Sequence, residues 1–418
     1  MKVRVLSLLS LILLVGCHSK MTRKTTSIKP EPGHVILGVD NFFQSYLHLV
    51  KDKRVGLLTN PSGVNASMKT TSDLLYEHDE INLTALYGPE HGIRGAIHAG
   101  DHVHDEIDMK TNLPLYSLYG KSRKPTPEML KMIDVMLVDI QDIGLRAYTY
   151  IYTMANVMKA AAENGKRVVI LDRPNPIGGI RVEGNLVEKE FESFVGLYPI
   201  PYRHGMTIGE LALLFNSEFQ INCQLDIVPM KGWQREMYWE NTGLNWIPTS
   251  PHIPHWQSVL FCAATGMFGE LGTLSEGVGY TSPFELVGAP WIDGRLFAEY
   301  LNNMNIAGVY FRPLYFRPYY LHYQGQICQG VQLHITDYSE FHPYSTGLHI
   351  MQTHMKLYPD HDLFSKPDRV KMFDKVVGTD KIRKSLQRAI PVDEIVKSWQ
   401  TELNEFNKTR EKYLLYRE

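Results

Sequence analysis

Short apolar runs rich in β-branched residues alternate with longer segments of helical period between residues 34 and 230. This alternation is typical of a parallel sheet whose strands are joined by crossover helices. We expect strands over residues 54–59, 83–87, 135–140, 167–171 and 224–229. We expect helices over residues 72–78, 127–132, 150–164 and 207–219. The pattern predicts an α/β fold with a Rossmann-like, doubly wound parallel sheet.

The start of the last of these helices carries a capping pattern. Thr207 is followed three residues later by Glu210, so the hydroxyl and the carboxylate can each satisfy a backbone amide there. No GxGxxG sequence follows the first expected strand. Because those glycines let the backbone approach a pyrophosphate, the sequence gives no support for nucleotide binding of the usual kind.

A Pro-rich passage at residues 247–254 ends the α/β region, which we place at residues 34–257. A second, smaller α+β domain is expected over residues 258–418. It begins with a Gly-rich stretch at residues 266–277, which reads as a loop, continues through strand-like segments such as residues 330–336, and ends in helices.

The first residues follow a different pattern. Lys2 and Arg4 precede an apolar run over residues 5–15 that is too short to span a bilayer, which indicates an export signal. The run ends in Leu14-Val15-Gly16-Cys17, which resembles the lipobox of bacterial lipoproteins. We therefore expect a signal peptide at residues 1–16, a lipidated Cys17 and a flexible tether at residues 17–33. The predicted location is the cell envelope, with the protein held at the membrane by its lipid anchor on the periplasmic side or the cell surface.

Charge and cysteine content narrow the function further. Lys and Arg total 43 against 45 Asp and Glu, the net charge is -2, and no block of like charge occurs, so nucleic acid is not an expected partner. Beyond the signal, Cys223, Cys262 and Cys328 are an odd number at wide spacing. They allow at most one disulfide and match no zinc or redox motif.

Polar and turn-forming residues follow four of the expected strands. These segments are Asn60-Pro61-Ser62-Gly63, Gly88-Pro89-Glu90-His91-Gly92, Gln141-Asp142 with Arg146, Tyr148 and Tyr150 close behind, and Asp172-Arg173-Pro174-Asn175-Pro176. Such residues also form ordinary turns. Because open parallel sheets bind ligands beyond the carboxyl ends of their strands, four such edges in succession predict a polar site there.

Eight segments in order resemble one known family. They are VGLLTNPSGV, YGPEHGIRG, VDIQDIGLRAYTYIYTM, LDRPNPIGG, VEGN, YRHGMTIGELALLFN, GTLSEGVGYTSPFE and VKSWQTELNEFNKTREKYLLY. The chain is similar over about residues 34–418 to the exo-β-N-acetylmuramidases of the NamZ type, formerly a domain of unknown function. One departure is His252, where the family pattern leads us to expect Asn.

The resemblance implies a glycoside hydrolase of cell-wall turnover and recycling. Such an enzyme releases β-1,4-linked N-acetylmuramic acid from the non-reducing ends of peptide-free peptidoglycan. The implied partners are saccharides that end in N-acetylmuramic acid, and no cofactor or metal is implied. It also implies a cleft between the Rossmann-like domain and a smaller second domain that completes it.

Glu90 is the expected general acid. Glycosidic cleavage ordinarily needs a carboxylic acid to protonate the leaving oxygen, and Glu90 lies between glycines at a strand end, where a sugar can approach closely. The resemblance also points to Glu90, although a loop carboxylate is the alternative. His91 could orient the sugar or the acid. For a second catalytic group the sequence leaves Asp142, Asp139, Glu183 and Glu276 open, and Asp139 could equally accept hydrogen bonds from loop amides.

The sugar itself sets a further requirement. N-acetylmuramic acid carries a lactyl ether that ends in a carboxylate, so a selective pocket needs a cation. Arg146 and Arg173 are the leading candidates, followed by Arg94 and Arg203, with surface salt bridges as the alternative. Aromatic stretches at residues 148–152 and 311–323 could wall the pocket. The other candidate substrate-binding residues are Asn60, Asp139, Gln141, Tyr148, Asn175, Glu183 and His204.

Two other functions stay open at this point. A metal-dependent hydrolase could use His91, His98, Asp101, His102 and His104, although their spacing matches no standard motif such as HExxH and a solvated loop explains most of them. A lipid-anchored protein could also bind cell-wall saccharides in the same cleft without turnover.

Overall fold

Six parallel strands form the centre of the larger sheet in the computed structural model, which describes residues 34–90, 92–93, 106–120 and 122–417. The strand order is β3-β4-β2-β1-β5-β6-β7, and β3 is antiparallel at the edge. The strands are β1 (Arg54–Thr59), β2 (Asn82–Gly88), β3 (Glu106–Ile107), β4 (Pro114–Ser117), β5 (Val135–Asp139), β6 (Arg167–Leu171) and β7 (Gln224–Val228). Without β3, this is the doubly wound order, and the winding reverses between β1 and β5. The predicted Rossmann-like α/β class is confirmed.

Helices cover both faces of this sheet. They are α1 (Gly38–Asn41), η1 (Phe42–Tyr46), η2 (Leu47–Leu49), α2 (Thr71–Tyr76), α3 (Pro127–Leu130), α4 (Tyr150–Glu163), η3 (Lys189–Phe191), α5 (Ile208–Glu218) and η4 (Trp239–Thr242). Met136 and Val138 of β5 face the core shared with α4 and α5, whereas Val135 and Leu137 face the core shared with α1 and α2. Burial on both faces explains why the central strands β5 and β6 are nearly continuous apolar runs.

The predicted elements end within one or two residues of the observed ones, and the predicted capping box is present. Thr207 Oγ1 accepts a hydrogen bond from the amide of Glu210 at 3.2 Å, and Glu210 Oε2 accepts one from the amide of Thr207 at 3.0 Å. Both interactions join residues three positions apart, so a local sequence pattern was sufficient to predict them.

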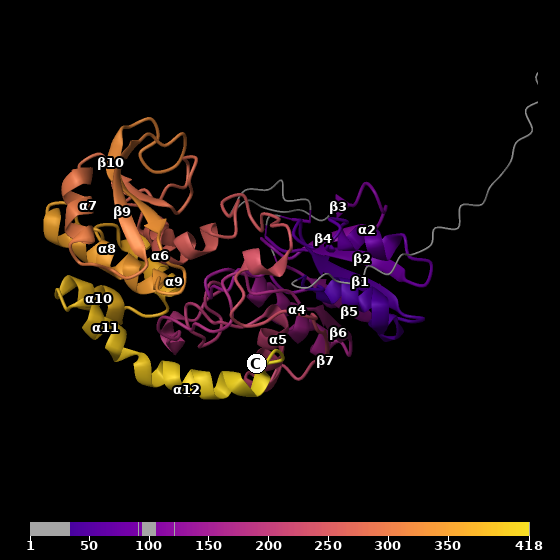
Figure 1. Ribbon diagram of the computed structural model, residues 1–418. Coiled ribbons are helices and arrows are strands. Elements are labelled where there is room, and N and C mark those ends of the chain that lie inside the picture. Colours follow the sequence, from indigo (N-terminus) through magenta and orange to yellow (C-terminus); the bar gives the residue numbers. More distant parts are fainter. Residues whose placement is uncertain (1–33, 91, 94–105, 121, 418) are drawn as a thin grey trace, which may run out of the picture.

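The second domain combines a small antiparallel sheet with several helices (Figure 1). Its strands lie in the order β8-β10-β9. Its elements are α6 (Ser258–Leu271), β8 (Leu286–Ala289), α7 (Gly294–Asn302), β9 (Val309–Phe316), β10 (Cys328–Ile335), α8 (Pro343–Leu357), α9 (Pro367–Val377), α10 (Lys381–Gln387), α11 (Val392–Ser398), α12 (Gln400–Arg410) and η5 (Glu411–Tyr413).

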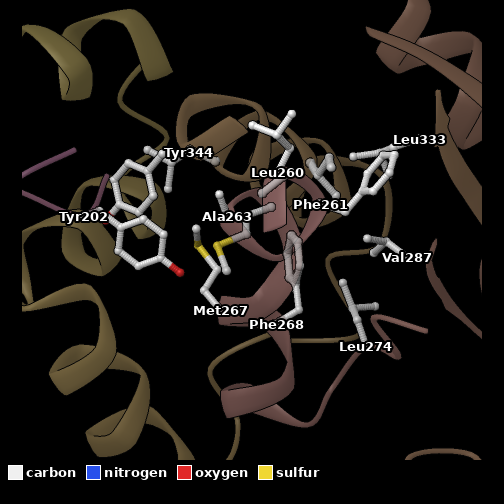
Figure 2. Packing of buried hydrophobic residues seen from close by; sticks show 14 of the residues in the cluster. Tyr202, Leu260, Phe261, Ala263, Met267, Phe268, Leu274, Val287, Leu333 and Tyr344 are labelled. Carbon is white, nitrogen blue, oxygen red and sulfur yellow. The ribbon is translucent and has the colours of Figure 1, made fainter. Parts of the chain in front are cut away.

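The apolar core of this domain surrounds α6, as Figure 2 shows with Leu260, Met267 and Phe268. The prediction of a loop over the Gly-rich stretch is therefore wrong up to residue 271, because this part forms the last turns of the helix. Its glycines serve close packing, since a Cβ at Gly269 would lie 3.0 Å from Glu276 Oε1. The helix ends at Gly272, whose φ of +62° is the left-handed conformation that glycine adopts readily.

The end of the chain returns from the second domain to the first. Figure 1 shows α12 leading back toward α5. Arg410, the last residue of α12, donates a hydrogen bond from Nη2 to the Gly205 carbonyl at 2.8 Å. Beyond the helix, the Tyr416 hydroxyl donates one to Asp172 Oδ2 at 2.6 Å. The last residues therefore belong to the core of the Rossmann-like domain although they follow the second domain in sequence.

Two further predictions concern the cysteines and the N-terminal segment. Cys223, Cys262 and Cys328 are all free thiols. The predicted signal peptide, Cys17 and tether lie outside the described residues. Within the part of the chain that the structure describes, no helix is long and apolar enough to cross a membrane.

Candidate active site

A cavity of about 590 Å³ lies between the loop after β5 and the second domain. Ile143, Leu145 and Tyr148 line it from the first domain, and α6, α9 and the segment after α6 line it from the second. A volume of this size is typical of small-molecule sites, which combine apolar walls with a few polar groups. Its ionisable side chains, apart from tyrosine and cysteine, are His252, Glu270, Glu276, His322 and Arg369.

Glu90 lies half-buried in the turn that follows β2. Its Oε2 accepts a hydrogen bond from Thr149 Oγ1 at 3.1 Å. Thr149 directly follows Tyr148, which lines the cavity, so a hydrogen bond connects the predicted general acid to the segment of the cavity wall, although Glu90 itself is not a lining residue. Burial and then the charge of Glu90 raise the pKa of Tyr119, which places that phenol close to Glu90 as well. His91 and Arg94 lie outside the described residues.

Asp139 and Arg173 form a buried ion pair at the point where the winding of the sheet reverses. Arg173 donates from Nε to Asp139 Oδ1 at 2.5 Å and from Nη2 to Asp139 Oδ2 at 2.8 Å. Thr71 Oγ1 donates to the same carboxylate, and Arg173 Nη2 also donates to the Val64 carbonyl at 2.7 Å. Each charge therefore neutralises the other. This geometry argues against Asp139 as the second catalytic group and against Arg173 as the residue that binds the lactyl group.

Arg146 is fully buried and joins the two domains. Its Nη1 donates to the carbonyls of Asn185 at 2.5 Å and Ile200 at 2.9 Å. Its Nη2 donates to the carbonyls of Val376 at 3.2 Å and Val377 at 2.6 Å, at the end of α9. A cation at a helix C-terminus is favourable, and these four carbonyls occupy both terminal nitrogens. Arg146 holds α9 in place instead of facing a ligand, contrary to its predicted role.

Glu183 and Arg203 also act within the fold. Glu183 Oε1 accepts hydrogen bonds from the amides of Tyr344 at 3.1 Å and Ser345 at 3.2 Å, so it caps the start of α8. Burial raises its pKa, and the Arg203 charge opposes that shift. Arg203 is 1% exposed and donates from Nη2 to the Ile177 carbonyl. Neither these two residues nor Asp142 lines the cavity, and Glu183 Oε2 is buried without a partner among the described residues.

Asp142 and His204 form a buried pair in the loop that leads to the cavity. Asp142 Oδ2 accepts hydrogen bonds from the Gly144 amide at 2.7 Å and from His204 Nε2 at 3.2 Å. His204 Nδ1 accepts a hydrogen bond from the Met206 amide at 3.2 Å, so the imidazole proton lies on Nε2. Asp142 Oδ1 is buried and has no partner among the described residues. Asp142 thus keeps one oxygen for another interaction.

The predicted amide side chains hold the strand-end loops together. Gln141 Nε2 donates to the carbonyls of Asp142 and Pro174, both at 2.7 Å. Asn175 Nδ2 donates to the Met206 carbonyl at 3.0 Å. Asn60 Oδ1 accepts a hydrogen bond from the Ser62 amide at 3.1 Å, and its buried Nδ2 has no partner in the described part of the chain. These three side chains therefore shape the sheet edge.

Tyr148 connects this edge to the cavity wall. Its hydroxyl donates to Thr249 Oγ1 at 2.8 Å, and the Tyr150 hydroxyl donates to the Thr249 carbonyl at 2.6 Å. The two rings meet edge to face with centroids 4.7 Å apart. The Pro-rich passage is thereby fixed against the start of α4. His252, the departure from the family pattern, lines the cavity from the same passage and contacts the Tyr320 hydroxyl at 3.0 Å.

Glu276 is the buried acid of the opposite wall. It is 4% exposed, and its Oε2 has no partner within the described residues. Burial raises the pKa of Glu276 to about 8, and the nearby charge of Glu270 acts in the same direction. Burial also raises the pKa of Glu270, and the Arg369 charge opposes that shift. Near neutral pH, Glu276 therefore carries its proton and can donate a hydrogen bond into the cavity.

Two polar groups of this wall were not predicted as site residues. Glu270 belongs to the Gly-rich stretch, where its place between glycines was a signal that a turn explained equally well. Arg369 lies in the first turn of α9, and nothing around it in the sequence distinguishes it from a surface helix arginine. The described residues contain no cluster of metal-ligating side chains, and the histidines of residues 98–104 lie outside them.

Comparison with known proteins places the chain in a class of glycoside hydrolases. Residues 55–257 match the N-terminal domain and residues 260–416 the C-terminal domain of the exo-beta-N-acetylmuramidase NamZ family. The chain is 48% identical over 395 residues to the peptidoglycan beta-N-acetylmuramidase NamZ of Bacillus subtilis, covering 94% of both chains. The chain therefore belongs to the NamZ family, as the eight motifs indicated.

Solved structures agree with this assignment. A DUF1343 family protein from Bacteroides fragilis is 45% identical, has a TM-score of 0.87 and covers 93% of this chain and 100% of its own. A second DUF1343 family protein of the same organism is 30% identical, has a TM-score of 0.73 and covers 92% of this chain and 99% of its own. Both domains of the chain thus occur together in the related folds.

Proposed function

We propose that this protein is an exo-β-N-acetylmuramidase that releases terminal N-acetylmuramic acid from the non-reducing ends of peptidoglycan fragments. The observation that carries the proposal is the 48% identity to the Bacillus subtilis muramidase over 94% of both chains. The cavity supports it, because the cavity is large enough for a sugar and its lining residue Tyr148 directly precedes Thr149, which holds the half-buried carboxyl of Glu90. Such an activity serves the turnover and recycling of the cell wall.

Glu90 acts as the general acid in this proposal. It gives its proton to the glycosidic oxygen as the bond to the sugar breaks, and the Thr149 hydroxyl keeps the carboxyl in place. The second carboxyl is Asp142, which His204 orients and whose Oδ1 has no other described partner. Glu276 is neutral near pH 7 and donates a hydrogen bond to a sugar oxygen.

The test is product analysis with the purified protein. A disaccharide with N-acetylmuramic acid at its non-reducing end should yield free N-acetylmuramic acid, detected by mass spectrometry. A longer peptide-free chain should shorten from that end only, and release of internal fragments would contradict the exo mode. Glu90→Gln should keep saccharide binding and lose turnover. Binding without turnover by the unaltered protein would show a non-catalytic wall-binding protein instead.

We further propose that Cys17 is acylated and that the enzyme acts in the cell envelope, anchored to the membrane by its lipid. This location brings the enzyme to its polymeric substrate. The support is the sequence Leu14-Val15-Gly16-Cys17 after a short apolar run. Cys17→Ser should release the protein from the membrane fraction and leave the specific activity of the released protein unchanged. Retention of Cys17→Ser in the membrane fraction would refute the lipid anchor.

A further inference from the structure

The proposed substrate carries a carboxylate that must find a cation in the cavity. Arg146 uses both terminal nitrogens on backbone carbonyls, Arg173 is paired with Asp139, and Arg146, Arg173 and Arg203 all lie outside the cavity lining. Among the described residues that line the cavity, Arg369 is the only lysine or arginine. It is exposed, and its side chain forms no hydrogen bond or ion pair with any other described residue.

From these contacts we infer that Arg369 binds the lactyl carboxylate of N-acetylmuramic acid and gives the enzyme its preference over N-acetylglucosamine. The inference rests on the proposed function. A guanidinium offers two parallel N–H donors that match the two oxygens of a carboxylate. Because a carboxylate loses hydration as it enters the cavity, a fixed positive group must replace that hydration.

The residues around Arg369 belong to the same wall of the cavity. Arg369 lies in the first turn of α9, and α9 packs against α6, which carries Glu270. The Arg369 charge acts on Glu270 and on His322 without an ion pair to either. Burial, together with this charge, lowers the pKa of His322, so that imidazole adds no competing positive charge near pH 7.

Arg146 fixes the other end of the same helix. Its Nη2 binds the carbonyls of Val376 and Val377, two turns beyond Arg369, and its Nη1 binds carbonyls of the first domain. The helix that carries Arg369 is therefore held against the domain that carries Glu90. This connection fixes the helix that carries Arg369 relative to the domain that carries Glu90. Selection of one sugar needs such a connection, because the lactyl carboxylate and the bond to be cleaved belong to the same sugar.

The experiment compares two aryl β-glycosides, one of N-acetylmuramic acid and one of N-acetylglucosamine, with the full-length protein. Arg369→Ala should lower kcat/KM for the muramic substrate on the order of 100-fold and change that for the glucosamine substrate less than about twofold. Arg369→Lys keeps the charge without the planar fork and should recover part of the loss. Lys371→Ala removes a positive charge from the same helix outside the cavity lining and should leave both substrates unaffected.

A muramic substrate whose lactyl carboxylate is esterified supplies an independent measurement. Arg369→Ala should affect this ester no more than the glucosamine substrate, because the charge that Arg369 binds is gone. Equal losses on all substrates, or no loss on the muramic substrate, would overturn the inference while the muramidase activity of the unaltered protein stands. Failure of the unaltered protein to release N-acetylmuramic acid would instead refute the proposed function. Circular dichroism confirms that each variant is folded.

Discussion

On the sheet side of the cavity, Asp139 and Arg173 satisfy each other in a buried ion pair, whereas on the opposite side Glu276 is buried with an oxygen that has no described partner. Both sides contain acids and arginines of the same kinds. The Asp139–Arg173 pair and Glu276 differ in whether each group meets a complementary partner within the fold, and Asp142 on the sheet side resembles Glu276 because its Oδ1 has no described partner. A charged residue at a strand end is therefore a weak indicator of binding until its partners are known, because the fold itself needs such residues to close its polar edge.

The same comparison separates the two roles of arginine. Arg146 uses its two terminal nitrogens on four carbonyls and joins the domains, while the exposed Arg369 lines the cavity. Breaking a satisfied group should lower stability, removing an exposed group without a partner should change activity with little effect on stability, and a buried acid without a partner should make stability depend on pH. Four further experiments test this distinction.

The largest effect is expected from Glu90→Gln, because it removes the proton that the leaving oxygen receives. Turnover of the natural disaccharide should fall by about 10²- to 10⁴-fold. The loss should be smaller for an aryl glycoside with a good leaving group, which needs little protonation. Urea denaturation should show a free energy of unfolding within about 0.5 kcal/mol of the unaltered protein. Equal losses on both substrates would count against Glu90 as the acid.

The second-largest effect is expected on the free energy of unfolding, from a substitution in the buried ion pair. Asp139→Asn leaves the Arg173 charge buried without its counterion and should lower the free energy of unfolding by about 3–5 kcal/mol. Adding Arg173→Met to this variant removes the uncompensated charge and should restore part of the loss. Urea denaturation of the unaltered protein and the two variants measures both steps. A stable Asp139→Asn protein that has lost only its turnover would return Asp139 to the catalytic candidates.

Glu276 should make stability depend on pH. Its pKa rises from 4.5 to about 8 on folding, so the unfolded chain loses this proton at lower pH than the folded protein does. The folded state then binds more protons between about pH 4.5 and 8, and its stability falls as pH rises through that window. At ~1.4 kcal/mol for each pH unit, the total effect is on the order of 5 kcal/mol at most. Glu276→Gln has no such proton to lose, and the difference in unfolding free energy between the two proteins should therefore grow from pH 5 to pH 8. Parallel pH profiles would contradict this assignment.

The smallest effect is expected from Tyr148→Phe, which removes one hydroxyl from the connection between the sheet edge and the cavity wall. Loss of its hydrogen bond to Thr249 should cost about 1 kcal/mol in the free energy of unfolding. A double-mutant cycle with Thr249→Val isolates this interaction, because the aromatic ring at this position still packs against Tyr150. If the Tyr148→Phe substitution raises KM without any change in stability, the hydroxyl binds substrate instead of holding the loop.

Local patterns in the sequence were sufficient for much of the fold. The strands β1, β2, β5 and β6 are mostly buried and read as apolar runs, and the capping box of Thr207 and Glu210 spans three residues. The strands β3 and β4 were missed because they are short and β4, next to the edge strand β3, begins with a proline. The end of α6 was missed because its glycines serve packing against Glu276, which no local pattern reveals.

The sequence by itself determined the class of the sheet, the family and the position of Glu90 at a strand end, because these depend on residues that are close together in the chain. Only the tertiary structure decided which charged residues face the cavity. Arg173 meets Asp139 across 34 positions, and Arg146 meets Val377 across 231. The partner that satisfies a charge can come from any distance along the chain, and a group's availability to a ligand depends on that partner's place in the fold.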